Sequence, residues 1–199
     1  MYEIGCILLG YLYGSIPFAL VIGKLFYNTD VRKSGSGNLG GTNAGRVLGK
    51  KAGVAVIILD AFKAFFIVLL TNYLSQLLGF NNDVKYIAGV ACIIGHCWPV
   101  FAQFKGGKAV STSIGYFLCV APIWAVLSLV VFFIVLKISK YVSLSSIIAS
   151  LSVLLILPTL NVTLTGKICL ALSIFILVFR HKENIKRIFN KTESKITWM

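Results

Sequence analysis

The chain has 199 residues, of which 58% are apolar and 13% are charged, and its mean hydropathy is +0.90. A soluble domain is about half apolar and about a quarter charged, so the composition excludes an ordinary soluble protein and indicates an integral membrane protein. The net charge of +13 would suit nucleic-acid binding. However, the basic residues lie in short loops between apolar segments, where the preference for positive cytoplasmic loops explains them. We therefore expect membrane lipids and phosphorylated substrates as partners, and no nucleic acid.

Six apolar segments follow one another along the chain, at about Ile4–Phe26, Ala52–Leu78, Lys85–Phe101, Val110–Leu136, Val142–Leu160 and Val162–Phe179. A helix needs about 20 such residues to cross a bilayer, so these segments predict membrane-spanning helices. Pro17 is expected to kink the first segment, and Pro122 interrupts the fourth. The first segment follows Glu3 rather than a basic region, so we interpret it as a retained helix and not as a signal peptide.

The distribution of charge decides between six and seven spans. Basic residues concentrate in the loop at 27–51, around Lys105 and Lys108, at Lys137 and Lys140, and in the tail from Arg180, whereas the connections at 81–83 and 161–165 carry almost none. Dividing 110–136 at Pro122 into two short helices places every basic cluster on one face. We therefore predict an all-α integral membrane protein with seven transmembrane helices, an external N-terminus and a cytoplasmic C-terminus. Residues 1–199 are expected to form a single polytopic membrane domain.

Three polar stretches are expected on the cytoplasmic face, and the first is SGSGNLGGTNAGR at 34–46. Its glycines let backbone N–H groups converge on an anion, and its arginine can bind phosphate through two hydrogen bonds. We predict a phosphate-binding loop; the alternative is that the glycines only form turns. The G-x-G-x-x-G pattern is not a dinucleotide motif, because the acid that it would need, Asp60, lies inside an apolar segment. The residues that this pattern singles out are Gly35, Gly37, Gly40, Gly41 and Arg46.

The second polar stretch is GHCWPVFAQFKGGKAVST at 95–112. Gly107 and Lys108 belong to a glycine-rich loop suited to phosphate, although it is not a nucleotide P-loop, because Ala109 follows the lysine. The alternative is that the lysines of this loop serve only as topology signals. His96 ends an apolar segment, and we interpret it as an interfacial histidine that donates to a backbone carbonyl.

The third polar stretch is RHKENIKR at 180–187. On a helix His181 and Asn184 would share one face, which favours a functional role for both. In the second apolar segment Asp60 and Lys63 are also three residues apart. Ionisable residues inside a membrane are usually functional, but here we predict an ion pair that braces the helices.

In this order, and over nearly the whole chain, the three stretches resemble the cytoplasmic motifs of the bacterial acyl-phosphate:glycerol-3-phosphate acyltransferase family (PlsY). The early stretch GYLYGSIPFALVIGK and the Asp60/Lys63 pair also fit. The resemblance implies transfer of a fatty acyl group from acyl phosphate to the 1-hydroxyl of sn-glycerol 3-phosphate, which gives lysophosphatidic acid and phosphate for phospholipid biosynthesis. It also implies a multi-pass enzyme of the bacterial cell membrane, with its active site facing the cytoplasm and with no metal or cofactor. We expect a monomer.

By position in the motifs, the resemblance implies catalytic roles for Ser36 and His181. It implies that Gly37, Asn38, Thr42, Asn43, Arg46, Gly107, Lys108 and Asn184 bind the substrates and their phosphate groups. The chain departs from the usual family pattern with GGTN in place of GATN, with Trp98 in place of phenylalanine, and with KGGKAV in place of KGGKGV. The last change adds a methyl group to a loop that needs close backbone approach, so its effect on rate or donor preference stays open.

The residue types suit this chemistry without the resemblance. Acyl phosphate is a mixed anhydride with a good leaving group, so the protein needs mainly to orient two reactants and to stabilise an oxyanion. No covalent acyl-enzyme is predicted. The proton of the acceptor hydroxyl can pass to His181 or to a phosphate oxygen of the donor, and both alternatives stay open.

Three other classes fit the sequence less well. The H-x4-D signature of acyl-CoA-dependent acyltransferases is absent, and so are the clustered aspartates of a CDP-alcohol phosphotransferase. A transporter for phosphorylated anions would predict an internal repeat and charged groups near the middle of the bilayer. Here the polar motifs are expected at one face.

Overall fold

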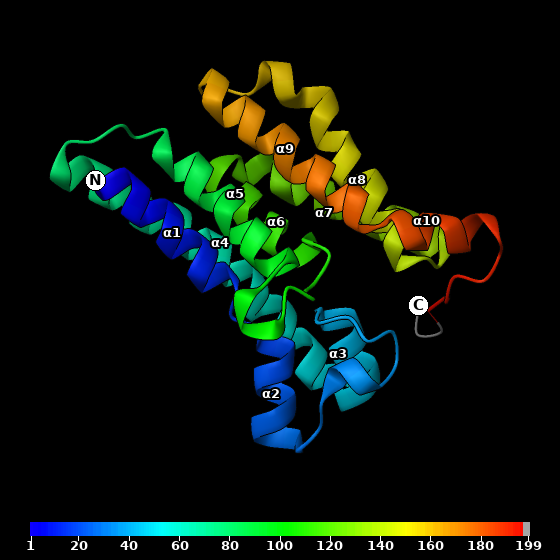
Figure 1. The fold of residues 1–199 in the computed structure, drawn as a ribbon. Coiled ribbons are helices and arrows are strands. Elements are labelled where there is room, and N and C mark those ends of the chain that lie inside the picture. The colour runs from blue at the N-terminus through cyan, green and yellow to red at the C-terminus, as the bar shows by residue number, and fades with distance from the viewer. Residues whose placement is uncertain (197–199) are drawn as a thin grey trace.

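The structure is a computed structural model that describes residues 1–196, and the regular elements of this part are helices (Figure 1). The ten α-helices of residues 1–196 are α1 (Tyr2–Gly14), α2 (Phe18–Tyr27), α3 (Gly41–Leu48), α4 (Lys50–Leu78), α5 (Val84–Cys97), α6 (Val110–Val120), α7 (Pro122–Ser139), α8 (Val142–Ile156), α9 (Leu164–Arg180) and α10 (Lys182–Phe189). The 3₁₀ turns η1 (Val31–Lys33), η2 (Val100–Ala102) and η3 (Leu157–Thr159) lie between them. The all-α class is therefore as predicted.

Within residues 1–196, four helical segments are long and apolar enough to cross a membrane. They are α4, α5 with η2, α7, and α8 with η3; the number rises to six if the bent pairs α1–α2 and α9–α10 each count as one span. Helix α6 is apolar but has only 11 residues. The seven predicted spans thus all correspond to helices, whereas their crossing of the membrane and their orientation remain predictions.

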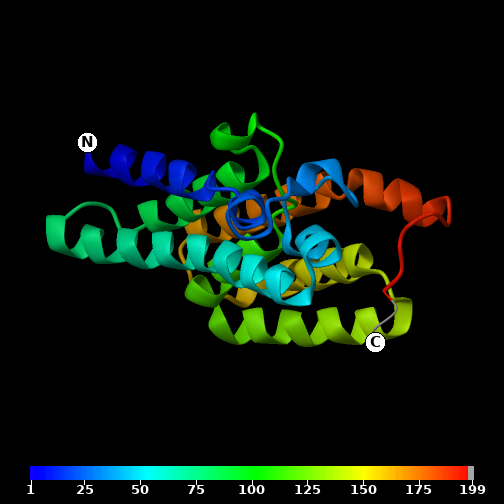
Figure 2. The ribbon, with the colours of Figure 1, turned by 90° about the horizontal axis from the view of Figure 1, so that it is seen from below.

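Two of the expected helix breaks are present at the predicted prolines. Pro17 separates α1 from α2, which are bent by 43°, and Figure 2 shows α2 nearly end-on while α1 lies across the view. Pro122 begins α7, directly after α6. The prediction of two short helices there is wrong for the second one, because α7 continues to Ser139 and has 18 residues.

The polar stretch at 34–46 is not a loop throughout, because α3 begins at Gly41. Glycine disfavours helices by about 1 kcal/mol relative to alanine, so the sequence predicted a loop over this whole stretch. In the structure Gly41 and Gly45 lie against Gly53 of α4, whose added Cβ would come within 2.9 Å of the Gly41 carbonyl oxygen and 2.6 Å of the Gly45 Cα. Close packing of α3 on α4 therefore offsets the cost of these glycines.

Helix α5 lies at the centre of the bundle: 67% of the apolar segment formed by α5 and η2 is buried, against 17% for α7. It packs on α1 without room for side chains at the contact. A Cβ at Gly14 would overlap the backbone of Cys92, and one at Gly95 would overlap the carbonyl oxygen of Tyr11. Small residues at such contacts are typical of membrane helices. This packing fixes the end of α5 that leads into the second polar stretch.

The three polar stretches lie together at one end of the bundle (Figure 1). Asn38 of the first contacts Gly106 of the second, and Lys108 of the second contacts Asn184 of the third. At the opposite end of the bundle, the N-terminus lies near the connections at 81–83 and 161–165, which carry few basic residues. Glu3 accepts a hydrogen bond from the Asn81 N–H, and Asp83 accepts one from the Thr163 hydroxyl. The expectation that the motifs share one face is therefore confirmed, whereas the compartment they face remains a prediction.

Candidate active site

An open cleft of about 1670 Å³ lies where the three polar stretches meet. Nine of the ten predicted site residues line it, namely Ser36, Gly37, Asn38, Thr42, Asn43, Arg46, Lys108, His181 and Asn184. Gly107 lies behind this surface, and its backbone contacts residues on either side of the loop. The structure therefore brings together residues that are up to 148 positions apart in the sequence.

The first loop is shaped from within by Asn43, which is 2% exposed. Its Oδ1 accepts a hydrogen bond from the Ser36 N–H at 2.7 Å, and its Nδ2 donates to the carbonyls of Val31 and Ser34. Because both ends of the Asn43 amide are used on the loop backbone, this residue holds the loop in its conformation. The Ser36 hydroxyl is left exposed at the cleft, as is Arg46 in the last turn of α3.

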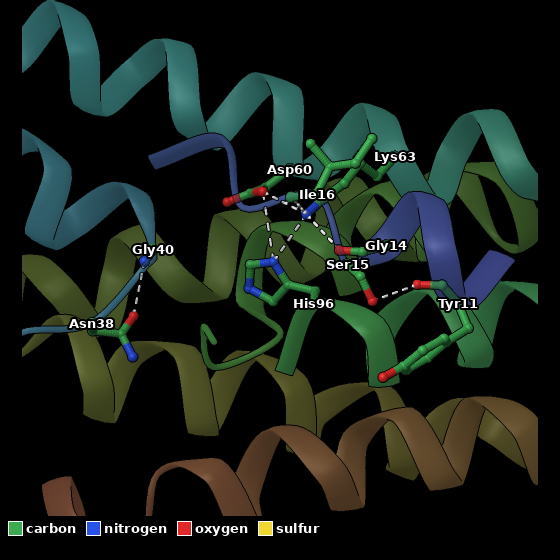
Figure 3. Close-up of polar contacts among 9 residues, drawn as sticks. All are labelled: Tyr11, Gly14, Ser15, Ile16, Asn38, Gly40, Asp60, Lys63 and His96. Atoms are coloured by element: carbon green, nitrogen blue, oxygen red, sulfur yellow. Dashed lines mark hydrogen bonds and ion pairs between the residues drawn. The ribbon is translucent and has the colours of Figure 1, made fainter. Parts of the chain in front are cut away.

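Asn38 joins the first loop to the second. Its Oδ1 accepts from the Gly40 N–H at 2.9 Å (Figure 3), and its Nδ2 donates to the Gly106 carbonyl at 3.3 Å. Arg180 reaches the same loop from the end of α9, and donates to the carbonyls of Gly107 at 3.0 Å and Gly106 at 3.2 Å. Its guanidinium also lies over the Trp98 ring. The sequence predicts no role for Arg180, because it does not show that this side chain contacts Gly106 and Gly107.

Lys108 points across the cleft to the third stretch, where its Nζ donates to Asn184 Oδ1 at 2.6 Å. Burial, together with the positive charges of Arg187, Arg180 and Arg46, lowers the pKa of the Lys108 ammonium group from 10.5 to about 8, with Glu193 acting in the opposite direction. A cation that is partly desolvated among other cations is favourably placed to bind an anion.

Glu193, for which the sequence predicts no role in the site, fixes Asn184 from the other side. Its carboxylate accepts from Asn184 Nδ2 at 2.7 Å, Ser143 Oγ at 2.6 Å and Arg187 Nε at 2.7 Å. Burial disfavours its charge, but these hydrogen bonds outweigh burial and lower the pKa of Glu193. Because a carboxylate only accepts, the Asn184 amide must direct its NH₂ to Glu193 and its oxygen to Lys108.

His181 lies at the junction of α9 and α10, which are bent by 50°, and it is 2% exposed. Its Nδ1 lies 2.8 Å from the Leu177 carbonyl oxygen. A carbonyl only accepts, so Nδ1 carries a proton. Burial lowers the pKa of His181 to about 4, so the ring is neutral near pH 7 and Nε2 keeps a lone pair. His181 and Asn184 both line the cleft, as the helical spacing predicted.

His96 does not face a carbonyl, contrary to the expectation from the sequence. Its Nδ1 instead lies 3.3 Å from Lys63 Nζ and 3.6 Å from Asp60 Oδ1. The predicted ion pair of Asp60 and Lys63 is present at 2.9 Å. Sequence spacing within α4 indicated the pair, but the approach of α5 that adds a histidine to it could not be read from the sequence.

Comparison with known proteins identifies the family. A family model described as glycerol-3-phosphate acyltransferase matches residues 4–191. A protein of Bacillus anthracis named glycerol-3-phosphate acyltransferase 2 is 47% identical over 193 residues, which cover 96% of this chain and 97% of the relative. A glycerol-3-phosphate acyltransferase of Listeria monocytogenes is 46% identical over 192 residues, or 96% of each chain. The chain belongs to the glycerol-3-phosphate acyltransferase family.

Solved structures of this acyltransferase family show the same fold. The crystal structure of PlsY, an integral membrane glycerol 3-phosphate acyltransferase, in its glycerol 3-phosphate form has a TM-score of 0.91 and 36% identity, and the match covers 99% of this chain and 96% of PlsY. The lysophosphatidic acid form has a TM-score of 0.89 and 35% identity, with the same coverage. The fold of this chain is therefore that of PlsY.

Two of the residues at which the sequence departs from the expected motif pattern, Ala109 and Gly41, have distinct surroundings in the structure. Ala109 has a φ of +66°, a left-handed conformation that favours glycine and costs an alanine about 1–2 kcal/mol. Its methyl group is fully buried in the core, which offsets part of that cost. At Gly41 an added Cβ would overlap the Ile57 side chain, so the absence of the usual alanine accompanies the close packing of α3 on α4.

The described part of this acyltransferase holds no group of three or more His, Cys, Asp or Glu side chains that could bind a metal ion. The acids at the cleft include Asp60 and Glu193, and each has a basic partner. The expected independence of metals and cofactors remains a prediction.

Proposed function

We propose that this chain transfers a fatty acyl group from acyl phosphate to the 1-hydroxyl of sn-glycerol 3-phosphate, which yields lysophosphatidic acid and inorganic phosphate. The observation that carries the proposal is the dual character of the cleft. Its lining includes both the cations Arg46, Lys108, Arg180 and Arg187 and the apolar side chains of Ile57, Ile114, Phe117, Phe132 and Phe133. A site of this kind suits one substrate that arrives from the lipid and one that arrives from water.

The acceptor hydroxyl attacks the carbonyl carbon of the acyl phosphate in this proposal. A carbon–oxygen bond forms to glycerol 3-phosphate, and the bond between the carbonyl carbon and the phosphate oxygen breaks with its electron pair on phosphate. The acceptor proton passes to a leaving-phosphate oxygen or to Nε2 of His181, which keeps a lone pair. The sequence of steps needs no covalent acyl-enzyme, because the leaving group is already activated.

The chain's residues supply positioning and electrostatic stabilisation. Ser36 and the first backbone N–H groups of α3 border the cleft and can donate to the developing oxyanion or to the leaving phosphate. Arg46 and Lys108 would bind the phosphate groups, while His181 and Asn184 would orient the acceptor. Such positioning can supply several kcal/mol, up to about 7–11 in favourable cases.

The proposed site lies at the end of the bundle with the basic loops, so it would face the cytoplasm of a bacterial cell. Both glycerol 3-phosphate and the headgroup end of the donor are accessible from that side. The crystal structures of PlsY with glycerol 3-phosphate and with lysophosphatidic acid support the acceptor and the product assigned here.

The donor assignment is tested with purified protein, glycerol 3-phosphate, and either palmitoyl phosphate or palmitoyl-CoA. We expect phosphate release and lysophosphatidic acid formation with palmitoyl phosphate, and no thiol release with the thioester. The readout is labelled glycerol 3-phosphate recovered in the lipid phase. Turnover with palmitoyl-CoA and none with palmitoyl phosphate would overturn the proposed donor.

Ser36→Ala and Arg46→Ala are each expected to lower kcat/KM by about tenfold or more, since each removes a donor exposed to the cleft. Both side chains are exposed, so the variants should insert and fold as the wild type does. Cys97→Ala is the matched control, because Cys97 is fully buried in the core and does not line the cleft. Wild-type rates in the first two variants would remove these residues from the site.

A further inference from the structure

A buried polar cluster lies directly behind the cleft, where Asp60 and Lys63 of α4 meet His96 of α5. The Lys63 side chain is fully buried, and those of Asp60 and His96 are 2% and 6% exposed. Figure 3 shows the three side chains converging, with Lys63 Nζ near both the Asp60 carboxylate and His96 Nδ1. The mechanism proposed above uses none of them, although Asp60 and His96 line the cleft.

Lys63 also holds the break between α1 and α2. Its ammonium group donates to the carbonyls of Gly14 and Ile16, each at 3.0 Å. Carbonyls at a helix end lack partners within the helix, and Pro17 has no N–H to offer. A cation at this position satisfies them and interacts favourably with the helix dipole. The cluster is therefore anchored to α1 as well as to α4.

His96 connects this anchored cluster to the loop of Gly106 and Gly107. The Gly107 N–H donates to the His96 carbonyl at 3.0 Å. An added Cβ at Gly107 would overlap Nε2 and Cε1 of the imidazole, and one at Gly106 would overlap the His96 carbonyl oxygen. The loop thus lies flat on His96, with one edge of the ring against Gly107 and Nδ1 on the other side toward Asp60 and Lys63.

We propose that His96, held by Asp60 and Lys63, is a positioning residue that sets the Gly106–Gly107 backbone and thereby places Lys108 to bind the acceptor phosphate. Lys108 directly follows Gly107, so a shift of the loop moves its ammonium group away from Asn184 and from the cleft. Arg180 and Asn38 hold the same loop from the cleft side, and the imidazole supports it from behind. This inference rests on the proposed phosphate-binding role of Lys108.

The first test is His96→Asn, which keeps a polar atom near the position of Nδ1 and removes the ring edge that supports Gly107. We expect the dissociation constant of glycerol 3-phosphate to rise by about tenfold or more, while kcat at saturating acceptor changes by less than about threefold. Binding is measured by equilibrium dialysis with labelled glycerol 3-phosphate and no acyl donor. Cys97→Ala, at the next and equally buried position, is the control for loss of packing and should leave binding unchanged.

The second test is a double-mutant cycle with Gly107→Ala, whose methyl group would overlap the imidazole. His96→Asn removes the two ring atoms that this methyl group would overlap, so the effects of the two substitutions on the dissociation constant should not multiply. We expect the double variant to bind glycerol 3-phosphate no more weakly than Gly107→Ala alone. A fully multiplicative cycle would show that the ring and the loop act independently.

The outcomes separate this inference from the proposed function. Unchanged binding by His96→Asn, in protein as thermally stable as the wild type, overturns the positioning role; so does a lower kcat at unchanged affinity. A wild-type protein that binds no glycerol 3-phosphate contradicts the proposed function itself. If palmitoyl phosphate failed as the donor, the two tests of glycerol 3-phosphate binding would still be valid, because they use no acyl donor.

Discussion

Replacing Lys108 by methionine is expected to lower kcat/KM for glycerol 3-phosphate by roughly 10²–10³-fold. Methionine keeps the length of the side chain but removes the only ammonium group that reaches Asn184 among the described residues. The group is partly desolvated in the free protein, so an incoming phosphate recovers part of an energetic cost that folding has already imposed. The loss should appear mainly in KM, which initial rates over a range of acceptor concentrations would measure.

The pH dependence of kcat/KM shows whether Lys108 acts through its positive charge or through the packing of its side chain. Since the pKa of Lys108 is lowered to about 8 in the free protein, the phosphate-binding ammonium form is complete below that pH and is lost above it. The value of kcat/KM should therefore fall above pH 8, by about tenfold per unit. In Lys108→Arg the alkaline decline should disappear, because arginine stays charged. An identical decline in both proteins would assign the titration to another group.

The convergence of the three polar stretches could be predicted from the sequence because each carries its own signal. Glycines with cations indicate anion binding, and the alternation of basic and neutral connections places them on one face. The contacts between Asn38 and Gly106 and between Lys108 and Asn184 agree with this inference. The break at Pro122 could be predicted for a local reason, since proline lacks the N–H that a continuous helix would need.

Other parts of the site depend on tertiary packing and had no local signal. Arg180 turns back to the loop glycines only because α9 ends beside them. Glu193 lies nine residues after Asn184 in a basic tail, where a carboxylate among several cations is usually solvated, although here it fixes the amide of Asn184. His96 was placed against a carbonyl because its neighbours on α4 are about thirty positions away in sequence.

One predicted residue and two that the sequence did not indicate support the three polar stretches in the same way. Asn43, Glu193 and His96 each hold one of the three stretches through a hydrogen bond, to Ser36, Asn184 and Gly107 respectively. A site that works mainly by orienting two phosphate-bearing reactants needs such rigid support, because misplacement of a donor by about 1 Å can cost roughly 10²-fold in rate.

The largest expected effect on stability is that of Lys63→Met. This change leaves Asp60 buried, with a protonated His96 as the only other cation in contact with it among residues 1–196, and removes the partner of the Gly14 and Ile16 carbonyls. Removing one member of a buried ion pair costs about 3–5 kcal/mol, and each unsatisfied carbonyl costs about 1–3 kcal/mol more. We expect a lower free energy of unfolding in mixed micelles titrated with SDS, and little protein that survives extraction at 37 °C.

Two variants separate the contributions to this loss. Asp60→Asn combined with Lys63→Met removes the unpaired charge but leaves the carbonyls of Gly14 and Ile16 without a donor, so its stability should lie between those of Lys63→Met and the wild type. Lys85→Met is the matched control at the opposite end of the bundle, where the lysine is half-exposed and donates to Asn72; its effect should stay within about 1 kcal/mol. If the double variant were no more stable than Lys63→Met, the unpaired charge of Asp60 would contribute little, and the loss would arise from the helix end that Lys63 caps.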